Sequence, residues 1–180
     1  EGSEVRLGGG ANAAHNAAAL GAKVTAVGML GDDEMGRALK EKFRAAKVSV
    51  QAVLHPEVPT ETKTRVLAGG VSTMRQQMLR IDRGARGRLP SPARATLARR
   101  VRAALRGADV ALVSDYGAGV LDEETRGELL AWAKVGGTLV VDARFALGRY
   151  PGATVAKPNE PELAALTGLP VRTDDEVLRA

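Results

Sequence analysis

Two short apolar runs on either side of a helix-like segment constrain this fold most. They are Ala108–Ser114 (ADVALVS) and Thr138–Asp142 (TLVVD), and near-continuous apolar runs of this length are typical of strands buried in a parallel sheet. The segment Asp122–Lys134 between them predicts a helix, and parallel strands need such a crossover to be connected. The pattern therefore predicts an α/β fold with a parallel sheet covered by helices.

The first third of the chain repeats this alternation. Gly21 follows a helical pattern as a C-terminal breaker, and Asp32 or Asp33 is placed as the N-cap of a second helix. Towards the C-terminus the elements become shorter. The further elements expected are helices over 12–20, 33–46, 91–106, 160–166 and 174–180, and strands over 23–28, 48–54 and 154–156.

The middle of the chain has a different pattern. Glu61–Ala68 and Gln76–Asp82 each alternate between polar and apolar residues and flank a turn that contains Gly69 and Gly70. Such a pair predicts a β-hairpin or adjacent antiparallel strands. The polar members are basic and amide residues, so one face is expected to meet a ligand. Residues 83–92, rich in Gly, Arg and Pro, are expected to form a loop.

The composition places the chain among globular proteins. Its 180 residues suit one domain, with 44% hydrophobic and 26% charged residues. No apolar run reaches the roughly 18 residues of a membrane span, and the N-terminal residues do not resemble a secretion signal. The absence of cysteine excludes disulfides and thiolate metal sites and fits a cytoplasmic protein.

The net charge of +5 raises the alternative of a nucleic-acid partner. The densest basic stretch is Arg94–Arg106, in which Leu97, Val101, Ala104 and Leu105 recur at helical spacing. The arginines are therefore expected on the opposite, solvated face of an amphipathic helix. Aromatic residues make up only 3% of the chain, too few for base-stacking platforms. We expect no nucleic-acid partner.

A glycine turn, Gly8-Gly9-Gly10, stands directly before a helix that carries Asn12 and Asn16. Backbone N–H groups at such a turn, aided by the helix dipole, can hold an anion or a polar ligand. Asparagine amides both donate and accept hydrogen bonds, which suits sugar hydroxyls. The same residues also fit an ordinary tight turn. No Gly-Lys-Ser/Thr follows, and the glycine spacing is not that of a dinucleotide fingerprint.

Polar residues follow the two apolar strands directly. Asp115 ends the first strand and Asp142 the second. Ligands of open parallel sheets bind just beyond the carboxyl ends of the strands, so both aspartates are candidates, although the segment after Asp115 equally fits a capping loop. Asn159 and Glu162 lie three apart at a strand-to-helix junction. They can order the water shell of Mg²⁺ and a phosphate, and their spacing equally predicts a helix capping box.

Taken together, these residues resemble the PfkB family of carbohydrate kinases, which has the ribokinase-like fold. Gly8-Gly9 is followed by Asn12, Ala14, Gly21 and Gly31 at the family's intervals, VGMLGDDEMG resembles its VGxxGxDxxG, and KPNEPEL resembles its Asn-x-x-Glu motif. Within the family, TKTRV, QQMLRID, SDYGAGVL and RYPGATVAKPN are most similar to the heptose-7-phosphate kinase domain of ADP-heptose synthesis enzymes.

The resemblance covers nearly all of residues 1–180 and implies a three-layer fold with a mostly parallel central sheet and a small β lid over about residues 58–82. It implies phosphoryl transfer from MgATP to a hydroxyl of a sugar or sugar phosphate, and a homodimer through the lid. Arg65 and Arg80 would face a phosphate on the sugar, and Glu162 would reach Mg²⁺ through water. The residues it assigns to the sugar are Gly8, Gly9, Asn12, Asn16, Lys63, Arg65, Arg80 and Asp115, and those it assigns to ATP and Mg²⁺ are Asp142, Lys157, Asn159 and Glu162.

The chain also departs from the family pattern. The family's catalytic base is an aspartate in a C-terminal GAGD motif, which these 180 residues do not contain, and its first strand, with a sugar-binding aspartate, has no match either. We therefore expect a piece of a longer protein that is inactive by itself. Ala118 and Arg144 stand where heptose kinases carry lysine. A catalytically incompetent fragment or a degenerate sugar- or nucleotide-binding module is the alternative.

Overall fold

The structure is a computed structural model that describes residues 2–69, 74–84 and 89–180. Gly70 of the expected turn, and residues 85–88 of the expected loop, lie outside the described residues. The helices and strands are α1 (Gly9–Ala19), β1 (Thr25–Gly31), α2 (Glu34–Ala45), β2 (Ser49–His55), β3 (Thr62–Ala68), β4 (Gln76–Arg83), α3 (Ser91–Leu105), β5 (Val110–Asp115), α4 (Glu123–Lys134), β6 (Thr138–Ala143), the 3₁₀-helix η1 (Leu147–Arg149), β7 (Val155–Ala156), α5 (Glu160–Thr167) and α6 (Asp174–Arg179).

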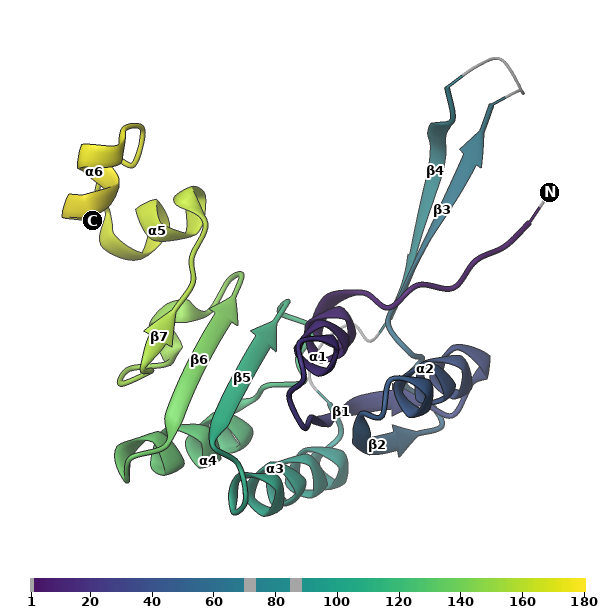
Figure 1. The fold of residues 1–180 in the computed structure, drawn as a ribbon, viewed down its shortest axis with the longest axis horizontal. Helices are drawn as coiled ribbons and strands as arrows, with labels where there is room; N and C mark the ends of the chain where they lie inside the picture. Colours follow the sequence, from purple (N-terminus) through teal and green to yellow (C-terminus); the bar gives the residue numbers. More distant parts are fainter. Residues whose placement is uncertain (1, 70–73, 85–88) are drawn as a thin grey trace.

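The strands pair as the sequence pattern predicts. β1 pairs with β2, and β6 lies between β5 and β7, with all of these strands parallel. β3 and β4 form a separate antiparallel hairpin. Because β1–β2 and β5–β6 progress in opposite directions across the molecule (Figure 1), right-handed crossovers place α2 and α4 on opposite faces of the sheet layer. The predicted α/β architecture with a β-hairpin is confirmed.

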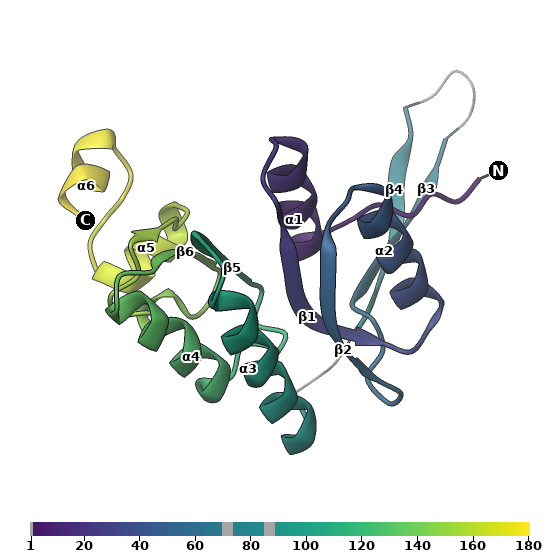
Figure 2. The ribbon, with the colours of Figure 1, turned by 60° about the horizontal axis from the view of Figure 1, so that its bottom comes forward.

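Helix α3 connects the two parallel sheets. It packs against β1, β2 and α4, and Figure 2 shows α3 and α4 along one face of β5 and β6. Leu97 of α3 is 1% exposed, and Leu139 and Val141 of β6 are 0% exposed. Val27 of β1 packs against both buried clusters of the protein, so one continuous core holds the two sheets together.

Two expectations about burial need correction. The first apolar run was predicted to be buried on both faces, but in β5 Ala111 and Val113 (4% exposed) pack in the core, whereas Leu112 on the other face is 52% exposed. The reason is that α3 and α4 cover one face of this strand. The arginines of α3 were expected to be solvated, but Arg94 forms an ion pair with the buried Asp122 at 3.3 Å, and Arg100 donates to the carbonyl of Ala52.

The helix starts follow from local hydrogen bonds. The carboxylate of Asp33 accepts from Gly36 at the start of α2, and Asp122 accepts from Thr125 at the start of α4, as N-cap aspartates do. Helix α1 begins at Gly9 rather than at the predicted Asn12, because the carbonyl of Gly8 already accepts the first helical bonds. No helix within the described ranges is long and apolar enough to cross a membrane.

Candidate functional site

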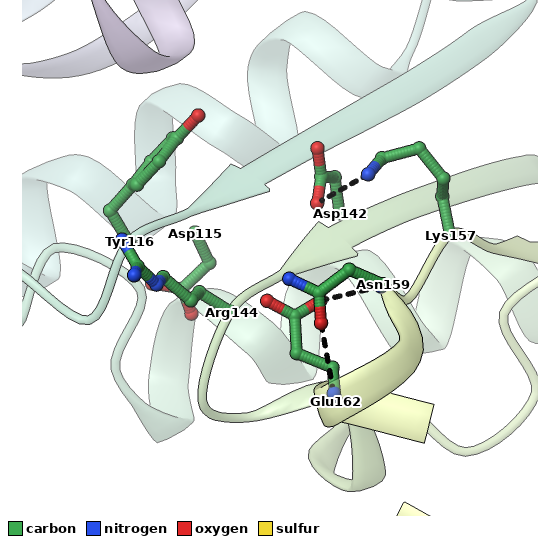
Figure 3. A pocket seen from close by; sticks show the side chains of 7 residues that line it. All are labelled: Asp115, Tyr116, Asp142, Arg144, Lys157, Asn159 and Glu162. Atoms are coloured by element: carbon green, nitrogen blue, oxygen red, sulfur yellow. Dashed lines mark hydrogen bonds and ion pairs between the residues drawn. The ribbon is translucent and has the colours of Figure 1, made fainter. Parts of the chain in front are cut away.

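Side chains from three strand ends line a hollow of about 200 Å³. The ends of β5 and β6, each with the residue that follows the strand, contribute one part of its wall, and the segment from β7 to the first turn of α5 contributes the rest. This is the position at which open parallel sheets bind ligands. The lining residues are Asp115, Tyr116, Asp142, Arg144, Lys157, Asn159 and Glu162 (Figure 3).

The hollow brings together five residues that the sequence singled out, namely Asp115, Asp142, Lys157, Asn159 and Glu162. Tyr116 and Arg144 were not among the candidate ligands. Both directly follow the end of a parallel strand, in the stretches that the sequence singled out around Asp115 and Asp142, but no ligand was assigned to them. The guanidinium of Arg144 lies 5.4 Å from the ring centroid of Phe145, a cation–π contact that restricts where its charge lies.

Asn159 and Glu162 form the predicted capping box. The Asn159 Oδ1 atom accepts from the Glu162 N–H at 2.9 Å, and the Glu162 Oε2 atom accepts from the Asn159 N–H at 3.0 Å. Two polar atoms take no part in the capping box, namely Glu162 Oε1 and the side-chain amide nitrogen of Asn159. Figure 3 shows both side chains at the hollow. The cap therefore holds two polar groups in place without using all of their hydrogen-bonding capacity.

Opposite charges meet across the same hollow. The ammonium of Lys157 lies 3.4 Å from Asp142 Oδ1, and the two side chains are 65% and 38% exposed. Among the described residues, no three His, Asp or Glu side chains gather closely enough to hold a metal ion by themselves. The carboxylates of Asp142 and Glu162 nevertheless suit Mg²⁺, which keeps several waters and binds through one or two carboxylates plus substrate phosphates. Arg144 and Lys157 suit phosphate oxygens.

Asp115 is 9% exposed, and both oxygens of its carboxylate accept hydrogen bonds. Oδ1 accepts from the N–H of Gly117 at 2.8 Å, and Oδ2 accepts from the hydroxyl of Tyr150 at 3.2 Å. Burial, followed by the charge of Asp115 and this hydrogen bond, raises the pKa of Tyr150 far above its usual value. Tyr150 therefore stays a hydrogen-bond donor at neutral pH, and Asp115 is fixed at the edge of the hollow.

The glycine turn meets the hollow through Tyr116. Gly8 is the N-cap of α1 without a side-chain hydrogen bond, and Gly9 has a φ of +52°. A Cβ at Gly9 would lie 3.5 Å from the ring of Tyr116. Asn12 and Asn16 are exposed and one turn apart, so they lie on one side of the helix. Within the turn, the backbone of Gly9 is therefore approached by the aromatic ring of Tyr116.

The candidate residues on the hairpin lie apart from the hollow. Arg65 of β3 stands directly opposite Arg80 of β4, and Lys63 stands opposite Asp82. Arg80 Nε donates to Asp82 Oδ1 at 2.7 Å, and all four residues are exposed. Figures 1 and 2 show the hairpin extending beyond the body near α2, away from α5. Two groups of candidate residues thus occupy different parts of the molecule.

Comparison with known proteins identifies the relatives. The model of the pfkB family carbohydrate kinases matches residues 2–180. The chain is 39% identical over 176 residues to the bifunctional protein HldE of Gluconobacter oxydans and 40% identical over 177 residues to that of Azorhizobium caulinodans. Each alignment covers 96% of this chain and 36% of the relative, so the chain spans about a third of the length of these relatives.

Solved structures show the same fold. Phosphofructokinase-2 from Escherichia coli in complex with fructose-6-phosphate matches with a TM-score of 0.72 at 24% identity, over 96% of this chain and 56% of that one. A possible 1-phosphofructokinase from Thermotoga maritima matches with a TM-score of 0.68 at 19% identity, over 94% and 54%. The predicted ribokinase-like fold is confirmed. Because the family model spans nearly every residue, the chain belongs to the pfkB family of carbohydrate kinases.

Proposed function

We propose that this chain is part of an ATP- and Mg²⁺-dependent kinase that phosphorylates a sugar phosphate, most specifically a heptose 7-phosphate. The single observation that carries the proposal is the polar hollow at the strand ends, in which Asp142, Lys157, Asn159 and Glu162 meet in a chain of this family. The HldE relatives support the heptose. The sugar hydroxyl oxygen would bond to the γ-phosphorus, ADP would leave, and the hydroxyl proton would pass to a base that we assign to no residue of this chain.

At the nucleotide end, the chain would bind phosphate and metal. Lys157 and Arg144 would contact phosphate oxygens, while Asp142 and Glu162 would hold the water shell of Mg²⁺, which neutralises charge on the transferred group when bound. The capping box keeps Glu162 in place before any ligand arrives. Such preorganisation is most of what phosphoryl transfer needs from a protein.

At the sugar end, the backbone at Gly8 and Gly9 and the amides of Asn12 and Asn16 would bind hydroxyls. Asp115 would present its remaining lone pairs to the sugar from the fixed position that Gly117 and Tyr150 give it. These groups supply both donors and acceptors, as a polyol requires.

The β3–β4 hairpin, over about residues 58–82, would act as a lid that carries the phosphate of the substrate. Like charges directly opposite each other destabilise a hairpin, and Arg65 and Arg80 stand in this relation next to Lys63. A bound phosphate would offset their repulsion, since arginine pairs well with phosphate oxygens. The basic residues face the same side because opposite partners of an antiparallel pair share one face.

The other face of the hairpin suits a second copy of the chain. Thr64 and Ile81, and Val66 and Leu79, are the pairs on this face, and Val66, Leu79 and Ile81 are 44%, 53% and 51% exposed. Exposed apolar residues gathered in this way mark protein contacts. We therefore propose a homodimer through the lid, and a cytoplasmic location, where ATP is available to the enzyme.

A degenerate sugar- or nucleotide-binding module is the second candidate, because Ala118 and Arg144 replace the lysines that heptose kinases carry. The test uses the full gene product with heptose 7-phosphate and MgATP. Release of ADP that depends on the sugar, with a new phosphosugar seen by mass spectrometry, supports the kinase. Calorimetric binding of the sugar without any ADP release supports the binding module and overturns the kinase.

A further inference from the structure

A compact hydrogen-bonded cluster lies between the end of β1 and the start of β3. Its members are Gly31, Asp33, Gly36 and Thr60, called here the Asp33–Thr60 cluster. Thr60 is 4% exposed, donates its hydroxyl to Asp33 Oδ1 at 2.7 Å, and donates its N–H to Asp33 Oδ2 at 2.9 Å. Its hydroxyl oxygen accepts from Gly31 at 3.0 Å. The hydroxyl and the N–H of Thr60 thus both form their hydrogen bonds within the cluster.

Asp33 serves two partners at once. Besides capping α2 through the Gly36 N–H at 2.8 Å, its carboxylate holds a residue 27 positions later in the chain. Burial opposes its ionisation, but the hydrogen bonds from Thr60 and Gly36 outweigh this effect and lower the pKa of Asp33. The side chain therefore does more than the N-cap role that its place before a helix suggests.

The two glycines leave no room for side chains. A Cβ at Gly31 would lie 2.7 Å from both Asp33 Oδ2 and the Thr60 nitrogen, and a Cβ at Gly36 would collide with the carbonyl of Gly31. Gly31, Asp33 and Gly36 form the G-x-D-x-x-G spacing within GDDEMG. In this structure the spacing is explained by the packing around Thr60, since none of its three residues lines the hollow.

The cluster lies at the base of the hairpin. Thr60 precedes the first residue of β3, Thr62, by two positions, and the hydroxyl of Thr62 donates to the Thr60 carbonyl at 2.9 Å. The hairpin extends from this base beyond the body of the protein (Figure 1), so a small rotation at Thr60 moves Arg65 and Arg80 by a larger amount.

We propose that Asp33 and Thr60 are positioning residues that fix the angle of the β3–β4 hairpin relative to the body, and through it the placement of Arg65 and Arg80. The effect on substrate binding rests on the proposed function, whereas the effect on the hairpin angle does not. Thr60 has no role in the hollow, so its influence passes through the strand that follows it.

The first experiment measures the hairpin angle directly in the full gene product. Residues 1–180 contain no cysteine, so M78C on β4, outside the apolar face proposed for the dimer, and A103C on α3, both at exposed positions, give one pair of spin labels within them. The variant T60V removes the hydroxyl at nearly constant volume, and T60S retains it. We expect T60V to shift or broaden the label distance distribution and T60S to reproduce that of the parent.

The matched control is D122N. Asp122 also caps a helix through a backbone N–H and is more buried than the half-buried Asp33, but its other partner is Arg94 of α3. We expect D33N to change the distance distribution and D122N to leave it unchanged, although both lower the melting temperature. A distribution in T60V and D33N that matches the parent overturns the proposal, whatever the enzyme's activity.

Kinetics then separate positioning from simple loss of stability. At a temperature where all variants are folded, T60V should raise the KM for the sugar phosphate about tenfold, while T60S and D122N stay within twofold of the parent and the KM for ATP is unchanged. An unchanged sugar KM in T60V, with a shifted hairpin, overturns the link to substrate. Absence of sugar-dependent ADP release in the parent refutes the proposed function alone, and the distance measurement still decides the positioning role.

Discussion

The hydroxyl of Tyr150 donates a 3.2 Å hydrogen bond to the carboxylate of Asp115 in a place where the two residues are only 4% and 9% exposed. Tyr150 follows η1, whereas Asp115 ends β5. The bond joins the segment after β6 to the loop at the edge of the hollow.

We predict that Y150F lowers the free energy of unfolding and makes local opening of this loop more frequent. The substitution leaves a buried carboxylate oxygen without its donor, which destabilises by about 2 kcal/mol. Urea unfolding measures the loss, and faster hydrogen exchange at Gly117 reports the loop. Y116F is the control because Tyr116 is 49% exposed. Equal stability of Y150F and the parent would show that Gly117 alone holds Asp115.

The capping box allows the cap and the proposed ligand role of Asn159 to be separated. N159A removes the cap and should lower the free energy of unfolding by about 1 kcal/mol. N159D keeps a good N-cap residue, so stability should be nearly retained, but the second carboxylate changes the affinity for MgADP. T173A, at the N-cap of α6, should lower stability with no change in nucleotide binding. Calorimetric titration with MgADP checks these outcomes, and unaltered affinity in N159D would remove Asn159 from the site.

The N-cap aspartates Asp33 and Asp122 make the free energy of unfolding depend on pH in the acidic range. Burial opposes ionisation of Asp33 and Asp122, but hydrogen bonds, with Arg94 beside Asp122, outweigh it and hold each pKa below its ordinary value of 3.8. A carboxyl group whose pKa is lower in the folded than in the unfolded state stabilises the fold at pH values above its unfolded-state pKa. This stabilisation is lost as the pH falls through the folded-state pKa. We predict that the unfolding free energy is level above about pH 5 and falls below about pH 4. D33N/D122N should flatten this decline in urea titrations at each pH, and an equally steep decline would assign it to other groups.

The alternation of strands and helices was predictable because each element carries its own periodicity and caps. Asp115, Asp142 and Asn159 could be expected to meet for a related reason, since the carboxyl ends of parallel strands share one edge. The start of α1 was misplaced at Asn12 because glycine is a poor helix former. Two of its glycines meet residues from another part of the chain, Gly9 the ring of Tyr116 and Gly10 Ser114, and no local pattern shows these contacts.

Contacts between distant residues carry no local pattern. Tyr150 and Asp115 are 35 positions apart and Thr60 and Asp33 are 27 apart, and no rule of spacing joins a threonine in a loop to a helix cap. The partial burial of Arg94, whose side chain is 17% exposed, was missed for the same reason. Its partner Asp122 is 28 positions away, and helical periodicity cannot show which neighbour a helix face meets.

The proposed dimer predicts a sharp effect of one charge on the apolar face of the hairpin. L79E places a carboxylate among Val66, Ile81 and their copies in the partner, where burial of an unpaired charge is unfavourable. We expect sedimentation velocity to show a dimer for the parent and a monomer for L79E. R99E, on the exposed side of α3, changes charge away from the hairpin and should leave the dimer intact. A monomeric parent would refute the interface.

The basic face of the hairpin gives the prediction that tests the substrate most directly. If Arg65 and Arg80 bind a phosphate already on the sugar, R65A and R80A should each raise the KM for the sugar phosphate by about tenfold or more, because hydrogen bonds between charged groups contribute about 1.5–3 kcal/mol. The KM for ATP should not change, and R99A on the exposed side of α3 should change neither. The unphosphorylated sugar completes the test, since its KM should be the same in the parent and both variants. A rise in KM for both sugars would show that the arginines hold the lid rather than the phosphate, and an unchanged KM for the sugar phosphate would exclude the hairpin from substrate binding.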